Sequence, residues 1–336
     1  MILVIEIRDF VGLKANSFAF NGAWTRGIMN VISHKYIFLS LSGILVAASI
    51  FAVAFWGLKF GIDFTGGSLL EVEFVERRPT SGEAGNALRD LGLGSVIIQP
   101  TGEKGMILRF REIDESTHQK VVANLQEASV RSPIQGSEGE KIIEKRFDAV
   151  GPTIGRELRA RALFALLVAG AAIILYIAWA FRRVSHPVAS WKYGAAAVSA
   201  LLHDITIPTG LFAFLGYWKG VEIDALFITA LLTIMGFSVH DTIVVFDRIR
   251  ENLIKASKSE EYGATVNRSI NETISRSINT SLTVLLVLGA IFAFGGETTR
   301  YFALALMVGV GFGTYSSIFV ASPLLVLWRR LRRRGN

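Results

Sequence analysis

The sequence predicts an α-helical polytopic membrane protein with six transmembrane helices and one small α+β domain between the first and second helices. Three observations lead to this fold class. Hydrophobic residues make up 51% of the 336 residues and charged residues only 19%, and the mean hydropathy is +0.45. Six apolar runs are long enough to cross a bilayer. A stretch of about 100 residues after the first run is rich in charge and contains no such run, which indicates a separate water-soluble domain.

The six candidate spans each approach or exceed the roughly 20 residues that a bilayer-crossing helix needs. They cover residues 35–57, 162–181, 193–217, 224–246, 277–295 and 301–327. The rest of the chain then divides into an N-terminal segment (1–34), the α+β domain (58–161) and a basic tail (328–336). The last five spans form one helical domain (162–327), which includes a polar loop at 247–276.

The basic residues in the short loops predict the orientation of these spans. Eighteen Lys and Arg residues lie in the N-terminal arm, the second-to-third loop, the fourth-to-fifth loop and the tail. Only two, Lys219 and Arg300, lie in the short loops of the opposite side. Since basic loops stay on the cytoplasmic side, we expect both termini to be cytoplasmic and domain 58–161 to be periplasmic or extracellular.

Within domain 58–161, strand-like alternation and helix-like spacing follow each other in the order β-α-β-β-α-β. Residues 70–74 alternate apolar and acidic side chains, and further strands are predicted at 96–99, 106–111 and 142–149. Helices are predicted around 84–91 and 121–128, the second opened by a capping box between Ser116 and Gln119. This order predicts a small ferredoxin-like sandwich.

The composition excludes several classes of function. There is no cysteine and there are only five scattered histidines, so neither a thiolate site nor a metal site is expected. The sequence has no nucleotide-binding loop and no catalytic triad pattern, so we expect neither an enzyme nor a cofactor. The net charge of +7 comes from basic residues beside apolar runs, which topology explains better than nucleic-acid binding.

The most informative residue is Asp241, which lies in the fourth predicted span. A carboxylate in hydrocarbon costs a few kcal/mol, so such a residue usually has a function, and carrying a proton is the obvious one. Arg276 enters the membrane at the start of the fifth span, at a depth that matches Asp241. Opening or closing an Asp241–Arg276 pair would load or release a proton. The alternative is a permanent ion pair that fixes helix register.

Three further titratable residues lie in the same spans. His203 and Asp204 fall near the middle of the third span, and His240 directly precedes Asp241. Asp204 is either part of the proton path or an interhelical hydrogen-bond partner. The two histidines are either packing residues or members of a proton relay.

One motif is more specific than these single residues. The run Phe60-Gly-Ile-Asp-Phe-Thr-Gly-Gly-Ser68 follows the first span. Its glycines allow a tight turn where helix becomes strand, and Asp63 can cap backbone NH groups. The run resembles a motif of the SecD/SecF family of protein-export membrane proteins. The resemblance continues in Phe147–Gly155, Leu202–Asp204 and Gly236–Asn252, of which the last resembles SecF members in particular.

The resemblance covers residues 34–327 and implies a specific assembly. SecF members pair with SecD in a twelve-span complex of the resistance-nodulation-division (RND) superfamily, beside the SecYEG translocon and often with a small YajC-like subunit. They are thought to use protons to pull an unfolded exported polypeptide outward. The essential aspartate of the family corresponds to Asp241 and its conserved arginine to Arg276. Relatives often have Asn where this chain has His240. The motif residues Gly61, Asp63, Phe64, Thr65, Gly66 and Gly67 look structural.

The sequence therefore predicts a SecF-like chain in a bacterial inner or plasma membrane, driven by the proton motive force. Two alternatives stay open: an RND-type exporter of small molecules, and a scaffold of the translocon that uses no energy. A measurement of drug accumulation would distinguish the exporter from the proton-driven component. The yield of the complex in variants would distinguish the scaffold from it.

Overall fold

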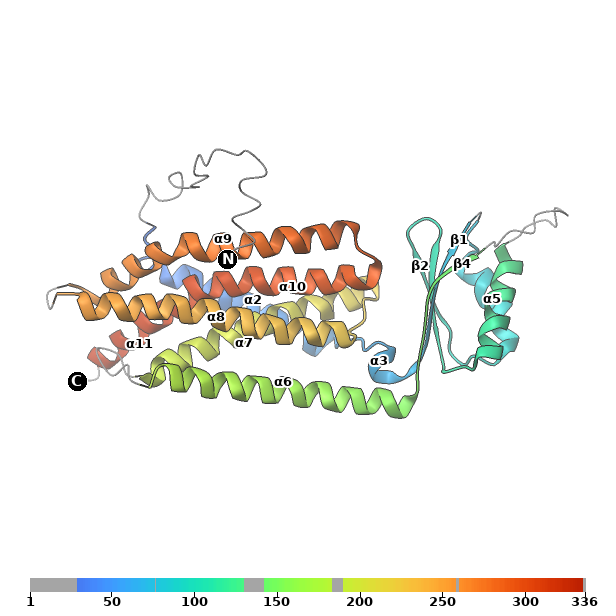
Figure 1. Cartoon of the computed structure of the whole chain (residues 1–336), viewed down its shortest axis with the longest axis horizontal. Coiled ribbons are helices and arrows are strands. Elements are labelled where there is room, and N and C mark those ends of the chain that lie inside the picture. The colour runs from blue at the N-terminus through green and yellow to red at the C-terminus, as the bar shows by residue number, and fades with distance from the viewer. Residues whose placement is uncertain (1–28, 76, 130–141, 183–189, 258–259, 335–336) are drawn as a thin grey trace, which may run out of the picture.

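The computed structural model describes residues 29–75, 77–129, 142–182, 190–257 and 260–334 (Figure 1). The described part contains a long helix bundle and, at one end of it, a separate α+β domain. Most of the predicted N-terminal segment and the last two residues of the predicted basic tail lie outside the described residues.

Six described helices are long and apolar enough to cross a membrane, as the sequence predicts. They are α2 (Lys35–Trp56), α6 (Pro152–Ala180), α7 (Ser190–Lys219), α8 (Ala225–Lys255), α9 (Tyr262–Phe294) and a sixth span that begins with α10 (Glu297–Ser316). The sixth span continues through η2, a π-helical turn (Ser317–Ala321), into α11 (Ser322–Arg334). α10 packs against α7, α8 and α9, and α2 packs against α7.

Three of these helices extend far beyond one end of the apolar runs that predicted them. α6, α8 and α9 extend ten, nine and fifteen residues beyond the predicted spans, so the predicted loop 247–276 is largely helical. Hydropathy marks only the apolar part of a helix, and ion pairs between successive turns support the polar part. In α8, Glu251 pairs with Arg248 at 2.6 Å and with Lys255 at 2.5 Å. α6 starts with Pro152, which needs no amide hydrogen-bond acceptor at the first helical position.

The α+β domain has the predicted order of elements. It comprises β1 (Gly67–Phe74), α4 (Ser81–Leu88), the short helix η1 (Arg89–Leu91), β2 (Ile97–Thr101), β3 (Gly105–Phe110), α5 (Glu115–Ser129) and β4 (Ile142–Val150). The strands form one sheet in the order β2-β3-β1-β4, and all neighbouring pairs are antiparallel. This is the ferredoxin-like arrangement that the sequence predicts.

α4 and α5 cover one face of this sheet, and the other face is turned toward the helix bundle (Figure 1). Leu70 and Leu108 from the sheet are buried together with Leu88 of α4 and Leu125 of α5. Because strand side chains alternate, their neighbours project from the opposite face. Residues such as Arg109 therefore point toward the bundle.

The start of α5 differs from the predicted capping box. Asp114 caps the helix: its Oδ1 accepts from the Thr117 amide at 3.1 Å and its Oδ2 from the Ser116 hydroxyl at 2.8 Å. These bonds favour the charged carboxylate and lower the pKa of Asp114 to about 2. Ser116 therefore donates to the capping residue Asp114 and is not itself the N-cap. The side-chain amide of Gln119 donates to the Glu115 carboxylate. The prediction was wrong because a carboxylate two residues earlier accepts both donors.

The joint between the domain and the bundle is close-packed backbone. Gly66 has φ = 76°, and a Cβ there would lie 2.6 Å from Cα of Pro152. Gly67 has φ = 126°, and a Cβ there would lie 2.8 Å from the carbonyl oxygen of Phe110. A Cβ on Gly155 would lie 2.7 Å from the amide nitrogen of Gly66. Only glycine fits these positions, so the start of β1 is held tightly against the start of α6.

Candidate functional site

Asp204 lies in the middle of α7 and is completely buried. Its Oδ2 accepts hydrogen bonds from the hydroxyls of Ser238 on α8, at 2.5 Å, and Ser316 at the end of α10, at 2.6 Å. Its Oδ1 lies 2.8 Å from Nδ1 of His203. Pro208, one turn later, has no amide hydrogen to donate to the Asp204 carbonyl, so the helix is weakened at this position.

Asp241 lies on α8, and only 9% of its surface is exposed. Its Oδ1 accepts from the Ser277 hydroxyl on α9 at 2.7 Å, and its Oδ2 accepts from the Ser317 hydroxyl at 2.5 Å. Both carboxylate oxygens of Asp241 are therefore bonded, each to a serine from a different helix.

The serines of the sixth span connect the two aspartates. Ser316 and Ser317 are consecutive residues at the point where α10 passes into the π-helical turn. The Ser322 hydroxyl donates to the carbonyl of Ser317 at 3.0 Å, and Pro323 removes an amide donor from the following helix. A π-helical turn inside a helix is often found at a functional site, because it reorients side chains.

The partners of the two carboxylates suit more than one protonation state. Among the residues that the structure describes, neither Asp204 nor Asp241 forms an ion pair with Lys or Arg. A serine hydroxyl can donate to a charged carboxylate and can also accept from a protonated one. The same geometry can therefore hold each acid either charged or neutral.

Arg276 does not contact Asp241 in this structure. The side chain of Arg276 is exposed, and the next residue, Ser277, is the one that α9 presents to Asp241. Neighbouring residues on a helix point about 100° apart, so Ser277 and Arg276 point in different directions. Arg276 instead lines an open cavity of about 340 Å³, together with Asp247, Arg248, Glu251, Glu272, Val244 and Thr273.

The two histidines lie in different surroundings. His203 is buried and packs against the rings of Tyr315 and Phe312 at 6.1 and 6.0 Å, and its Nε2 has no hydrogen-bond partner. His240 is exposed on the outside of α8. The structure therefore brings His203, but not His240, to a carboxylate.

The predicted motif 60–68 anchors the start of α8. Asp63 lies on the short helix α3 (Ile62–Thr65), and its Oδ2 accepts from the amide of Ala225 at 2.8 Å. Asp224, the residue before α8, accepts from the Phe227 amide at 2.8 Å. Two carboxylates thus cap the helix that carries Asp241.

The other motif residues hold α3 in place. Gly61 donates its amide to the carbonyl of Ile223 at 2.9 Å, and the Thr65 hydroxyl donates to the carbonyl of Gly61 at 3.0 Å. Phe64 is buried among apolar side chains of the bundle that include Phe212. These contacts hold the motif between the start of β1 and the start of α8.

Sequence reasoning missed the serines that hold the aspartates. The sequence analysis does not single out Ser277, Ser316 or Ser317. Their signal is weak, because a serine in an apolar helix usually bonds to its own backbone. The adjacent pair Ser316-Ser317 shortly before a proline in an otherwise apolar span could have drawn attention to η2.

Comparison with known proteins gives two family matches. Residues 132–331 match the family described as "Protein export membrane protein SecD/SecF, C-terminal". Residues 51–76 match the "SecD/SecF GG Motif", which covers the joint around Asp63, Gly66 and Gly67. The two matches include both aspartates and the motif that caps α8.

Curated relatives and a solved structure agree with these matches. The chain is 42% identical over 311 residues to the protein translocase subunit SecF of Thermobaculum terrenum, with 90% of this chain and 94% of the relative covered. It is 42% identical over 303 residues to the SecF subunit of Anaerolinea thermophila, with the same coverage of both chains. A crystal structure of SecDF from Thermus, described as a translocon-associated membrane protein, superposes with a TM-score of 0.75 at 31% identity.

That superposition covers 98% of this chain but only 42% of the SecDF chain, so this chain spans less than half of the solved protein. The family matches cover most of the sequence, and the identity to the curated relatives extends over nine-tenths of it. The chain belongs to the SecD/SecF family of protein-export membrane proteins.

Proposed function

We propose that the chain acts as the SecF subunit of a SecDF complex that uses the proton motive force to assist late steps of Sec-dependent translocation across the bacterial cytoplasmic membrane. The observation that carries this proposal is the burial of Asp241 among serine hydroxyls between three helices. A membrane protein retains a costly buried acid when the acid has a function, and proton uptake is the function that needs no further ligand.

Proton uptake at Asp241 would change how α8, α9 and the sixth span pack. A charged Asp241 accepts from Ser277 and Ser317, whereas a neutral one must donate one hydrogen bond itself. The two states therefore favour different hydroxyl orientations and helix contacts. A charge crossing 100 mV supplies about 2.3 kcal/mol, enough to bias a two-state element but not to unfold a cargo domain. Ratcheting of an already unfolded polypeptide fits this amount of energy.

A partner subunit is supported by polar side chains on the outer face of α8 and α9. His240, Arg276, Asn279 and Thr280 are all exposed there, within or at the ends of apolar spans. Polar groups that face hydrocarbon are costly, so a second protein covers this face. We assign SecD to it, because the solved relative is a SecDF chain of which this chain matches only a part. In the complex, Arg276 and His240 would lie at the subunit interface.

The names of the relatives support a proposal for the wider assembly. The curated relatives are translocase subunits, and the solved relative is translocon-associated. We therefore propose SecYEG as the channel that the complex serves and an unfolded exported polypeptide as its cargo. We add a YajC-like subunit as an accessory, on the strength of the family resemblance alone.

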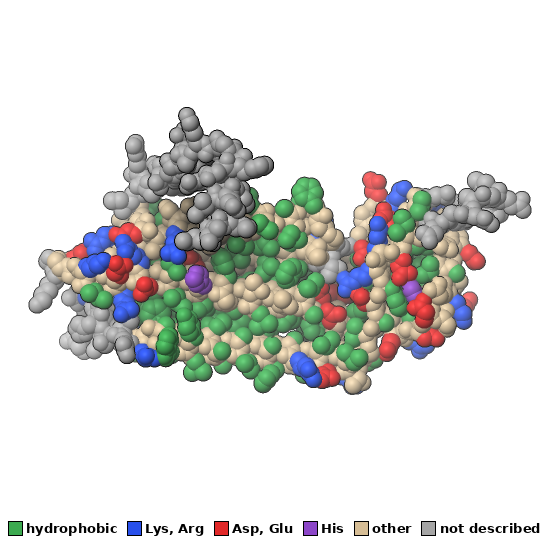
Figure 2. All heavy atoms as spheres, viewed as in Figure 1, with side chains coloured by type: hydrophobic (Ala, Val, Ile, Leu, Met, Phe, Trp, Pro, Cys, Tyr) green, Lys and Arg blue, Asp and Glu red, His purple; other side chains and the backbone are tan. Residues whose placement is uncertain are grey.

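The distribution of charge supports an orientation with cytoplasmic termini. Basic side chains gather at the end of the bundle remote from the α+β domain (Figure 2). Arg248, Lys255 and Arg268 lie at that end, on the polar extensions of α8 and α9. Because basic segments stay inside the cell, the α+β domain would lie on the periplasmic or extracellular side.

The decisive experiment is gradient-dependent export into membrane vesicles that contain the complex with Asp241→Asn. We expect assembly to be normal and stimulation by the gradient to be lost. A translocon scaffold that uses no energy would behave differently: the variant would lower complex yield, and export would fall only in proportion to that yield. Full gradient-dependent export by the variant would remove the proton role.

A further inference from the structure

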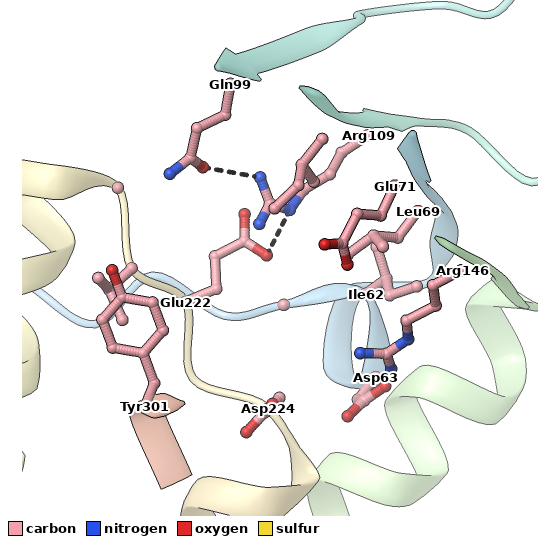
Figure 3. A pocket seen from close by; sticks show the side chains of 14 residues that line it. Ile62, Asp63, Leu69, Glu71, Gln99, Arg109, Arg146, Glu222, Asp224 and Tyr301 are labelled. Carbon is pink, nitrogen blue, oxygen red and sulfur yellow. Dashed lines mark hydrogen bonds and ion pairs between the residues drawn. The ribbon is translucent and has the colours of Figure 1, made fainter. Parts of the chain in front are cut away.

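The face of the sheet without helices meets the loop that joins α7 to α8 (Figure 3). This loop covers residues 220–224, between Lys219 and Ala225. Side chains of β1, β2, β3 and β4 and the loop line a small cavity of about 90 Å³ between the two parts of the molecule. The α+β domain therefore touches the bundle away from its covalent joint as well as at it.

The central contact across this boundary is an ion pair. Nε of Arg109 on β3 lies 2.9 Å from Oε2 of Glu222 in the loop, and both side chains are largely buried, with 14% and 18% of their surface exposed. Arg109 is held in position by Gln99 on β2, whose Oε1 accepts from it at 3.1 Å.

Gln99 extends the same contact to the backbone of the bundle. Its Nε2 donates to the carbonyl of Lys219, the last residue of α7, at 3.2 Å. Arg109, Gln99 and Glu222 thus connect two strands to the end of one helix and to the loop before the next. Figure 3 shows Gln99 and Arg109 pointing from the sheet toward Glu222.

Loop 220–224, which Arg109 contacts through Glu222, joins α7 and α8, the two helices that carry the buried acids. Asp204 lies on α7 and Asp241 on α8, and Asp63 caps α8 directly after the loop. The covalent joint, by contrast, ties the domain to α3 and α6 through Gly66 and Pro152. A displacement of α7 and α8 relative to α6 can therefore reach the sheet through the contact at Glu222.

Charges of both signs surround Glu222. Arg109 and Lys59 favour the carboxylate, Asp224 in the same loop opposes it, and Asp63, Arg146 and Glu71 line the same cavity. Burial raises the pKa of Glu222 above that of an ordinary glutamate in spite of Arg109. The desolvation of Glu222 therefore offsets part of its attraction to Arg109, so the net stabilisation of the docked state by the pair is small, whereas removing one partner alone is costly.

We propose that Arg109 and Glu222 form the contact through which the α+β domain follows the α7–α8 hairpin. Movement of the hairpin at Asp204 and Asp241 would be passed to the sheet through this pair. The part of the inference that concerns protons rests on the proposed function. The docking role of the pair stands on the geometry alone.

The docking role can be measured as a distance in the complete complex in lipid nanodiscs. The chain has no cysteine, so single cysteines introduced at the exposed positions Asn86 on α4 and Thr299 on α10 can carry spin labels. We expect Arg109→Ala and Glu222→Ala to raise the undocked fraction about tenfold or more, since each leaves a buried charge unpaired. The charge exchange Arg109→Glu with Glu222→Arg should restore the docked distance.

The matched control is Arg77→Ala, which removes an ion pair with Glu83 at 2.8 Å that lies entirely within the α+β domain. This control should leave the distance distribution as in the unmodified protein. If Arg109→Ala gave the same distribution as Arg77→Ala, the docking role would be overturned.

The coupling role is tested by adding Asp241→Asn as a mimic of the neutral acid. We expect Asp241→Asn to change the distance distribution when the pair is intact and to leave it unchanged when Arg109 is Ala. An equal change in both backgrounds, or no change in either, would overturn the coupling. Export by Asp241→Asn decides the proposed function separately, so the two failures are distinguishable.

Discussion

Ser316 and Ser317 are neighbours in the chain, yet their hydroxyls donate to two different aspartates on two different helices. Successive side chains of a helix point in different directions, which is why one turn of the sixth span can reach both α7 and α8. The π-helical turn begins at this pair. A change in the hydrogen bond between Ser317 and Asp241 can therefore be felt by the adjacent residue Ser316, which is the partner of Asp204.

The hydroxyl of Ser317 should matter for function. We expect Ser317→Ala to leave Oδ2 of Asp241 without its donor, which costs about 1.5–3 kcal/mol for a bond to a charged group. Gradient-dependent export should fall severalfold, and the melting temperature of the complex should decrease. Ser199→Ala is a suitable control, because its exposed hydroxyl bonds only to the carbonyl of Ala195. Equal export by both variants would show that Ser317 does not act on Asp241.

The joint at Gly66 should not tolerate a side chain. A Cβ would lie 2.6 Å from Cα of Pro152, and the backbone at φ = 76°, ψ = 166° is essentially restricted to glycine and costs another residue about 1–3 kcal/mol. We expect Gly66→Ala to lower the thermal stability of the full chain markedly, in a scan of the purified complex. Gly82→Ala is the matched control, since Gly82 lies in α4 with open space around it. It should be neutral or slightly stabilising; equal losses would contradict the steric explanation.

The cap that Asp63 supplies to α8 should be worth about 1 kcal/mol, the usual value for an N-cap. Asp63→Ala should lower stability by this amount, whereas Asp63→Asn should keep most of it because an amide oxygen also accepts. The comparison is made by thermal unfolding against Asp90→Ala, which removes an exposed carboxylate from η1. A loss no larger than that of Asp90→Ala would mean that Asp63 does not cap α8 in solution.

Docking of the α+β domain should depend on pH through Glu222. Burial raises the pKa of Glu222 in the docked state, so the docked state binds the proton more tightly than the undocked state does. Protonation then favours docking, because the neutral acid escapes the burial penalty and still offers Arg109 a carbonyl oxygen, which alanine does not. This contribution is fully present below the ordinary glutamate value of about 4.3 and is lost as pH rises through the raised value. The spin-label distance between positions 86 and 299 should show the docked fraction rising as pH falls from 7 to 4.

Glu222→Gln provides the control for this titration, since an amide does not ionise. The docked fraction should then depend less steeply on pH. Burial also raises the pKa of Asp224, and this residue accounts for the pH dependence that remains. A docked fraction that instead falls as the medium becomes acidic would show that the attraction of Arg109 outweighs burial.

Much of the architecture could be predicted because it follows from local patterns. The six spans follow from apolar length, and the order of the sheet follows from alternation in segments such as 70–74. The cap at Asp63 was expected as a type of contact, but its partner was not. Ala225 is 162 positions away in the chain, and no local rule identifies a contact of that range.

The geometry around the acids was harder to predict. The sequence predicts that Asp241 and Arg276 lie at the same depth in the membrane. Depth alone does not determine the side of the helix on which a residue lies. The register of α9 presents Ser277 to Asp241 and turns Arg276 outward. Likewise, His203 and His240 each neighbour an aspartate in sequence, but only His203 contacts one. Helix rotation is set by packing between distant segments, which a single sequence does not show.

The central claim is that Asp241 changes its protonation as the helices around it rearrange. The most direct measurement is infrared difference spectroscopy of the complex in membranes, in which a protonated carboxyl gives a carbonyl stretching band that Asp241→Asn removes. We predict a band that appears or disappears when the transmembrane gradient is applied and that is absent in Asp241→Asn. A spectrum that is identical with and without the gradient would contradict the claim and leave Asp241 as a fixed hydrogen-bond acceptor between the helices.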